Sequence, residues 1–69
     1  MGTVARVTEI SSTSEKSFED AIAVGVARAD ETLRKIRGAW VKEQEVRVVD
    51  GRIAEYQVNL LVTFVLDDA

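Results

Sequence analysis

The chain has 69 residues, with nine basic and twelve acidic side chains and neither cysteine nor histidine. Without those two residue types there is no disulfide framework, no thiolate metal site and no histidine base for catalysis. The net charge of −3 disfavours nucleic acid and anionic membranes as partners, because phosphate binding requires a basic excess.

A chain of this length forms one small domain, which buries only about 60% of the surface that its unfolded form exposes. Nevertheless, 46% of its residues are hydrophobic. We therefore expect an oligomer, since small scaffolds without cross-links depend on partners. No apolar run approaches the roughly 20 residues of a membrane-spanning helix, and the N-terminus lacks the pattern of a secretory signal. The expected location is the cytoplasm.

The N-terminal third of the chain predicts one strand and a connector. Residues 3–11 alternate between two faces and are rich in β-branched types, which favours a first strand. Val4, Arg6, Thr8 and Ile10 share one face of it, and Ala5, Val7 and Glu9 share the other. The hydroxyl-rich run 11–14 is typical of a turn, so we expect the strand to end there.

A helix is predicted over residues 17–36. Ser17 and Asp20 resemble a capping box at its start. Apolar side chains then recur every three or four residues, at Phe18, Ile22, Val26, Ala29, Leu33 and Ile36. Basic residues at 34, 35 and 37 suit the last turn, and Gly38 is a stop signal. Gly25 lies in the middle of this helix, either because another element approaches closely there or because a glycine is merely tolerated.

Two long strands are predicted at residues 39–49 and 52–66, joined by Asp50-Gly51. This dipeptide favours a two-residue turn with positive φ at both positions. Paired positions then sum to 101, which predicts the pairs Gly38–Thr63, Trp40–Leu61, Val41–Leu60, Lys42–Asn59 and Gln44–Gln57. The fold class is therefore α+β, a β-α-β-β chain whose three-stranded antiparallel sheet partly wraps one helix.

The hairpin has one apolar face and one mixed face. The apolar face carries Val41, Val58, Leu60, Val62, Phe64 and Leu66, and suits the helix stripe. The mixed face carries Trp40, Lys42, Gln44, Gln57, Asn59 and Leu61, which one helix cannot also cover. Fifteen residues of the last strand span about 50 Å, so this strand has to bend or project. Both features favour association.

No catalytic residues are predicted, and no metal ligands are assigned. Glu43 and Glu45 share a strand face and could hold a cation, but such a pair is more often a solvated edge. The mixed face is more promising, since an indole beside amide groups suits a planar heteroaromatic ligand. The alternative is that Trp40 anchors an interface and that the glutamines form an ordinary cross-strand pair.

Several segments, in their order and spacing, resemble one known family over essentially the whole length. They are V-T-E-I-S-S-T-S at 7–14, S-F-E-D-A-I at 17–22, A-R-A at 27–29, T-L-R at 32–34, and D-G…E-Y-Q-V…V-T-F-V-L-D at 50–67. The chain resembles the dodecins, small strand-helix-strand-strand proteins that assemble as hollow dodecamers and bind flavins.

The resemblance implies a ligand site with one departure from the family pattern. Flavin-binding members stack the ring on a tryptophan near the start of the second strand, and a glutamine in the third strand bonds the ring edge. Gln57 matches the glutamine, but Gly38 occupies the tryptophan position, and Trp40 follows about 6–7 Å further along. Either a strand shift brings Trp40 into that role, or the pocket holds a different ligand or none.

The sequence thus predicts a non-catalytic homo-dodecamer that binds or stores a small ligand at subunit contacts. The ligand is a flavin (FMN or riboflavin) or another nucleotide-type molecule. Coenzyme A, or a ligand-free structural or calcium-binding assembly, is the alternative that the resemblance leaves open. The candidate binding residues are Gly38, Trp40, Lys42, Gln44 and Gln57.

Overall fold

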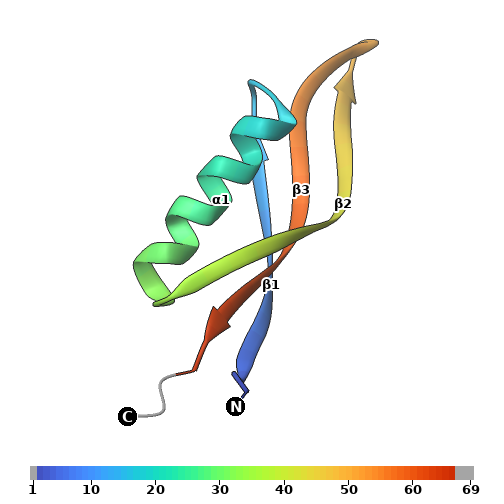
Figure 1. The fold of residues 1–69 in the computed structure, drawn as a ribbon. Coiled ribbons are helices and arrows are strands. Elements are labelled where there is room, and N and C mark those ends of the chain that lie inside the picture. Colours follow the sequence, from blue (N-terminus) through green and yellow to red (C-terminus); the bar gives the residue numbers. More distant parts are fainter. Residues whose placement is uncertain (1, 67–69) are drawn as a thin grey trace.

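The computed structural model describes residues 2–66, which form one helix and three strands. In chain order these are β1 (Ala5–Ser14), α1 (Phe18–Thr32), β2 (Ile36–Val49) and β3 (Arg52–Val65). The sheet is antiparallel with the order β1-β3-β2, and α1 lies along one side of it (Figure 1). The predicted β-α-β-β fold is confirmed. Within the described residues, no helix has the length and hydrophobicity to span a membrane.

The hydroxyl-rich run 11–14 belongs to β1, so the predicted turn is wrong. The reason is that its inward serines find partners at the start of α1. Ser12 Oγ donates to the Ala21 carbonyl at 2.8 Å, and Ser14 Oγ donates to Asp20 Oδ2 at 2.6 Å. With their hydroxyls satisfied, Ser12 and Ser14 are buried at little cost and join β1 to the helix.

The N-cap of α1 is confirmed, but its predicted end at residue 36 is wrong. Ser17 Oγ accepts a hydrogen bond from the Asp20 amide at 2.9 Å. The helix ends at Thr32, Leu33 is extended, and Lys35 has a φ of 60°. The basic residues at 34, 35 and 37 therefore do not lie in the last helical turn, and Gly38 is no helix stop. Strand pairing of Ile36 with Phe64 replaces the helical turn that local sequence favours.

The core lies between α1 and the middle of β3. Its fully or nearly fully buried apolar side chains are Ala21, Ala29, Val58, Leu60 and Val62. Gly25 faces the same contact, and a Cβ there would lie 3.0 Å from Ser12 Cβ and 3.1 Å from Leu60 Cδ1. Gly25 therefore lies where the sheet approaches the helix closely, which is the first of the two explanations that the sequence left open.

The predicted hairpin turn is confirmed, since Asp50 and Gly51 have φ values of 52° and 75°. Three irregularities interrupt the register, near Ile36, Val41 and Arg47, and both the pair Ile36–Phe64 and the pairs between the last two depart from the simple sum. One near Arg47 leaves Ala54 of β3 without a partner, and a second near Val41 leaves Lys42 of β2 without one. The pairs Gly38–Thr63, Trp40–Leu61 and Val41–Leu60 are confirmed. The predicted pairs Lys42–Asn59 and Gln44–Gln57 are wrong by one residue, because the register is shifted between the irregularities near Val41 and Arg47.

The hairpin end projects beyond the helix, as its length predicts. We call residues 44–57 the arm. The molecule measures 53 × 19 × 13 Å with a radius of gyration of 14.2 Å, against about 11 Å for a compact chain of this size. In Figure 1 the arm bends away past the N-terminal end of α1. The helix therefore covers only part of the sheet.

Candidate functional site

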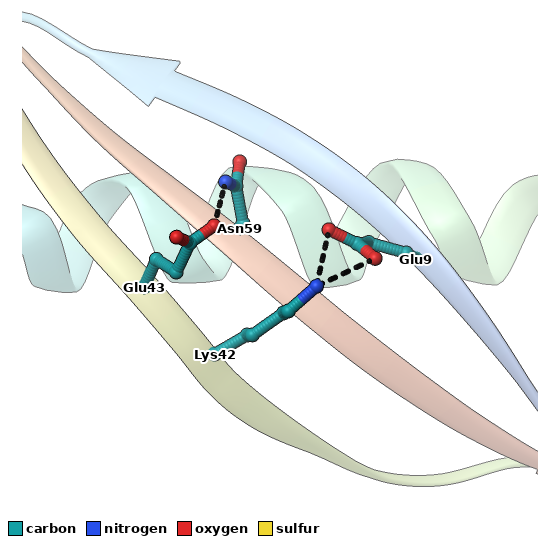
Figure 2. A network of polar contacts seen from close by, with 4 residues as sticks. All are labelled: Glu9, Lys42, Glu43 and Asn59. Carbon is teal, nitrogen blue, oxygen red and sulfur yellow. Dashed lines mark hydrogen bonds and ion pairs between the residues drawn. The ribbon is translucent and has the colours of Figure 1, made fainter.

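The sheet face opposite α1, which we call the open face, carries most of the predicted binding residues. It takes Val7, Glu9 and Ser11 from β1, Gly38, Trp40, Glu43 and Glu45 from β2, and Gln57, Asn59, Leu61 and Thr63 from β3. In Figure 2 the side chains of Glu9, Lys42, Glu43 and Asn59 stand on this face, with the helix behind the sheet. The face has an apolar end near the chain termini and a polar end toward the arm.

Trp40 dominates the apolar end. Its side chain is 72% exposed and lies opposite Leu61, while Gly38 lies opposite Thr63. The pairs from Gly38 to Val41 follow the predicted register, and the nearest irregularity lies between Ile36 and Gly38, where Arg37 has no partner. The stacking role of Trp40 stays a prediction. A Cβ on Gly38 would meet nothing within 4 Å, so the position beside Trp40 is empty.

Lys42 is the bulged residue of β2 and reaches across β3 to β1. Its Nζ lies 3.2 Å from Oε1 and 3.4 Å from Oε2 of Glu9 (Figure 2). Both side chains are about half exposed, so this ion pair contributes little to stability. The ammonium of Lys42 and the carboxylate of Glu9 are thus already engaged with each other on the open face.

The polar end is a ladder of hydrogen bonds across all three strands. Gln57 Nε2 donates to Ser11 Oγ at 3.1 Å, and Gln57 Oε1 accepts from Arg47 Nη2 at 3.1 Å. Asn59 Nδ2 donates to Glu43 Oε1 at 2.7 Å. A shallow depression of about 240 Å³ lies here, lined by Glu43, Gln44, Glu45, Gln57 and Asn59.

Gln44 does not face Gln57 as predicted. It borders the polar depression, but its cross-strand partner is Val58, which is fully buried under the helix. Gln57 is paired with Glu45 instead. Cross-strand partners project to the same side of a sheet, so the shift by one residue moves Gln44 to the helix side. The two glutamines therefore cannot form one amide pair on the open face.

Trp40 and Gln57 lie at opposite ends of the open face. Their partners show that four residue steps of β3 separate them, which is about 13 Å. The two side chains therefore belong to different parts of the open face of one chain.

Two participating residues were missed by sequence reasoning. Glu9 pairs with Lys42, and Ser11 accepts from Gln57, both from β1. The alternation of β1 places Glu9 and Ser11 on one face, but nothing local shows that β1 lies next to β3 rather than β2. Within residues 2–66, no three acidic side chains lie close enough together to hold a metal ion.

A single helix packed on a long, twisted three-stranded sheet defines a class of small β-α-β-β proteins, and comparison with known proteins identifies the family. The family model described as Dodecin matches residues 4–67. The dodecin of Thermus thermophilus is 40% identical over 68 residues, which are 99% of each chain. The solved structure of the dodecin from Streptomyces davaonensis has a TM-score of 0.92 and 37% identity, and the match covers 99% of this chain and 100% of that one.

A further solved structure is the calcium dodecin of Mycobacterium tuberculosis, described as a calcium-chelating antigen with a novel calcium-binding site. It has a TM-score of 0.80 and 37% identity, over 97% of this chain and 96% of that one. The chain studied here belongs to the dodecin family, since a family model spans nearly all of it and a relative of the same length is 40% identical.

Proposed function

We propose that this protein is a cytoplasmic, non-catalytic homo-dodecamer that binds and stores a flavin or another nucleotide-type ligand at contacts between its subunits. Membership of the dodecin family supports the assembly and the type of function. The open face supports the place, because it combines an aromatic plate with amide groups on a surface that the chain itself leaves uncovered.

The observation that carries the proposal is the exposure of Trp40. A tryptophan that is 72% exposed, on the open face beside the empty position of Gly38, offers its indole for stacking. Aromatic rings stack on such a plate with a gain of about 1–3 kcal/mol per ring. Because Gly38 leaves room beside it, the bound ring has space on the side of the chain termini.

Gln57 supplies the polar recognition, from a different copy. Its amide uses one N–H for Ser11 and one lone pair for Arg47, which leaves one N–H and one lone pair. This donor and acceptor match the edge of a ring that carries alternating carbonyl and ring-nitrogen groups. The hydrogen bonds to Ser11 and Arg47 fix the amide in place before the ligand arrives.

A nucleotide-type ligand with phosphates, such as FMN or coenzyme A, has one further observation in its favour. Lys42 lies two residues after Trp40 and projects over the same face. A phosphate could take the place of the Glu9 carboxylate at its ammonium. The carboxylates of Glu9 and Glu43 already accept hydrogen bonds from Lys42 and Asn59. We therefore propose that this face binds a ligand without catalysing a reaction.

The test is a titration of FMN and riboflavin by fluorescence quenching, with assembly size followed by light scattering. We expect wild-type protein to quench the flavin, and Trp40→Ala to weaken binding about tenfold or more without changing assembly size. Val4→Ala, which also shortens an exposed apolar residue, is the control and should bind normally. If Trp40→Ala disassembles the protein, Trp40 is an interface anchor and the site is wrong. Quenching that survives in Trp40→Ala would equally contradict the proposal.

A further inference from the structure

Two irregularities of opposite sense bracket residues 43–47 of β2. The one near Val41 adds Lys42 to β2, and the one near Arg47 adds Ala54 to β3. The pairs that flank this segment have residue numbers that sum to 101, whereas the pairs within it sum to 102. Because the two extra residues lie on different strands, a slip of the segment by one residue would cancel both irregularities and leave one continuous ladder.

The core of the chain does not hold this segment in one register. Four of its five side chains are exposed, and Val46 alone among them is half-buried. The helix packs mainly on β1 and β3 and hardly touches β2. In Figure 1 the arm stands clear of α1. A slip by one residue is strongly penalised only where one face of a strand is buried, so the register of residues 43–47 is weakly specified.

Two surface hydrogen bonds and the half-buried Val46 favour the observed register. Asn59 Nδ2 donates to Glu43 Oε1 at 2.7 Å. Arg47 Nη2 donates to Gln57 Oε1 at 3.1 Å. Water competes for such exposed groups, so these bonds contribute little to stability. The observed register also leaves one residue of each strand without a partner in the ladder, and its advantage over the slipped register is therefore small.

A slip would exchange the side chains that β2 presents on the open face. Glu43, Glu45 and Arg47 lie there in the observed register. After the slip they would turn to the helix side, and the residues at 42, 44 and 46 would take their places. Lys42 already projects over this face, so its charge stays (Figure 2). Two carboxylates and one guanidinium would leave, which makes the face less negative by one charge and favours an anionic ligand.

We propose that residues 43–47 exchange between the observed register and one slipped by a single residue, and that an anionic ligand on the open face selects the slipped one. The pairs from Gly38 to Val41 stay in place. The exposed tip beyond Arg47 keeps its pairs and turns over with the strands. A ligand shifts such an equilibrium only through its different affinity for the two states. The coupling to the ligand rests on the proposed function, whereas the slip itself does not.

Because the chain has no cysteine, engineered disulfides can trap each register. Glu55 lies opposite Arg47 in the observed register and would lie opposite Val46 in the slipped one. Directly opposite side chains are close enough for a disulfide, whereas side chains on opposite faces of a sheet are not. Arg47→Cys/Glu55→Cys thus traps the observed register, and Val46→Cys/Glu55→Cys traps the slipped one. Under mild oxidation both variants should form the bond within one chain, as detected by mass spectrometry of the denatured protein.

The two trapped registers should differ in their affinity for FMN, measured by fluorescence titration. Oxidised Val46→Cys/Glu55→Cys should bind FMN at least about fivefold more tightly than its own reduced form. Oxidised Arg47→Cys/Glu55→Cys should bind FMN more weakly than its reduced form. Riboflavin, which lacks the phosphate, should show smaller differences. Equal FMN affinities of the oxidised and reduced forms of both variants would overturn the selection of a register by the ligand.

The slip and the proposed function can fail separately. If Val46→Cys/Glu55→Cys forms no bond while Arg47→Cys/Glu55→Cys does, the slip is overturned and the proposed function is untouched. If wild-type protein does not bind FMN, the proposed function is overturned, and the disulfides formed without ligand still decide on the slip.

A measurement on the wild-type protein covers the case in which a variant does not fold. In valine methyl NMR spectra, Val46 should give two signals or one exchange-broadened signal, because the slip moves it from one face of the sheet to the other. The fully buried Val62, whose pairs the slip leaves unchanged, is the control and should give one sharp signal. A single sharp Val46 signal that FMN does not shift would overturn the inference.

Discussion

The two glycines Gly25 and Gly38 lie in opposite environments, one tightly packed and one open. At Gly25 the sheet approaches so closely that a Cβ would lie 3.0 Å from Ser12. At Gly38 a Cβ would meet nothing, and no positive φ excludes a larger residue. A side chain at Gly25 would thus press on Ser12 and Leu60, whereas Gly38 removes a side chain from the open face.

The empty place at Gly38 gives a prediction of gained function. Gly38→Trp puts an indole where the family resemblance places the stacking residue, two positions from Trp40 on the same face. We expect riboflavin to bind at least tenfold more tightly, since a second stacking partner adds about 1–3 kcal/mol. Fluorescence titration measures this directly.

The matched control for that variant is Ala39→Trp, which adds the same side chain to the neighbouring residue on the other side of the strand. It should leave riboflavin affinity unchanged. Equal affinity of Gly38→Trp and wild-type protein would show that the open face near residue 38 does not contact the ligand.

Among the helix and strands, features that depend on nearby residues could be predicted from the sequence, whereas features that depend on packing between distant segments could not. The Asp50-Gly51 turn and the Ser17 cap depend on residues within one turn, and both are confirmed. The apolar spacing of Leu33 and Ile36 continues the helical stripe, yet pairing with β3 draws Ile36 into a strand. Ser14 has turn chemistry but finds a partner in α1. These outcomes depend on elements distant in sequence.

The candidate site was predictable to the same degree. Trp40, Lys42 and Gln57 lie on the face that alternation and the turn together predict. Gln44 does not, because the irregularities near Val41 and Arg47 have no local sequence signal and shift the register of the segment between them. Glu9 and Ser11 entered the site only through the strand order, which places β1 beside β3.

The junction of β1 and α1 gives a prediction for stability. Ser14→Ala removes the hydroxyl that donates to Asp20 and accepts from the Lys16 amide at 2.9 Å, and leaves these groups without that partner. We expect the free energy of unfolding to fall by about 1–3 kcal/mol, measured by urea denaturation. Thr13→Ala, at the exposed neighbouring position of the same strand, should change it by less than about 0.5 kcal/mol. Equal stabilities of the two variants would show that the hydrogen bonds of Ser14 do not stabilise the junction of β1 and α1.

For the whole molecule, the elongated shape and the separation of Trp40 from Gln57 both favour an assembly of several copies. The chain has a 53 Å long axis, and its arm stands clear of α1. We propose that Trp40 of one copy and Gln57 of another contact the same ring, so that assembly and binding depend on the same contacts. Twelve copies, as the family implies, would both cover the apolar surface and complete the sites.

The most direct test of this account is native mass spectrometry of the protein purified under mild conditions, before and after addition of FMN. We expect a single species with the mass of twelve 7.6 kDa chains, to which FMN molecules bind as discrete mass increments. Trp40→Ala should retain the mass of the twelve chains and lose the increments. A monomer, or a twelve-chain species that takes up no FMN, would contradict the proposal.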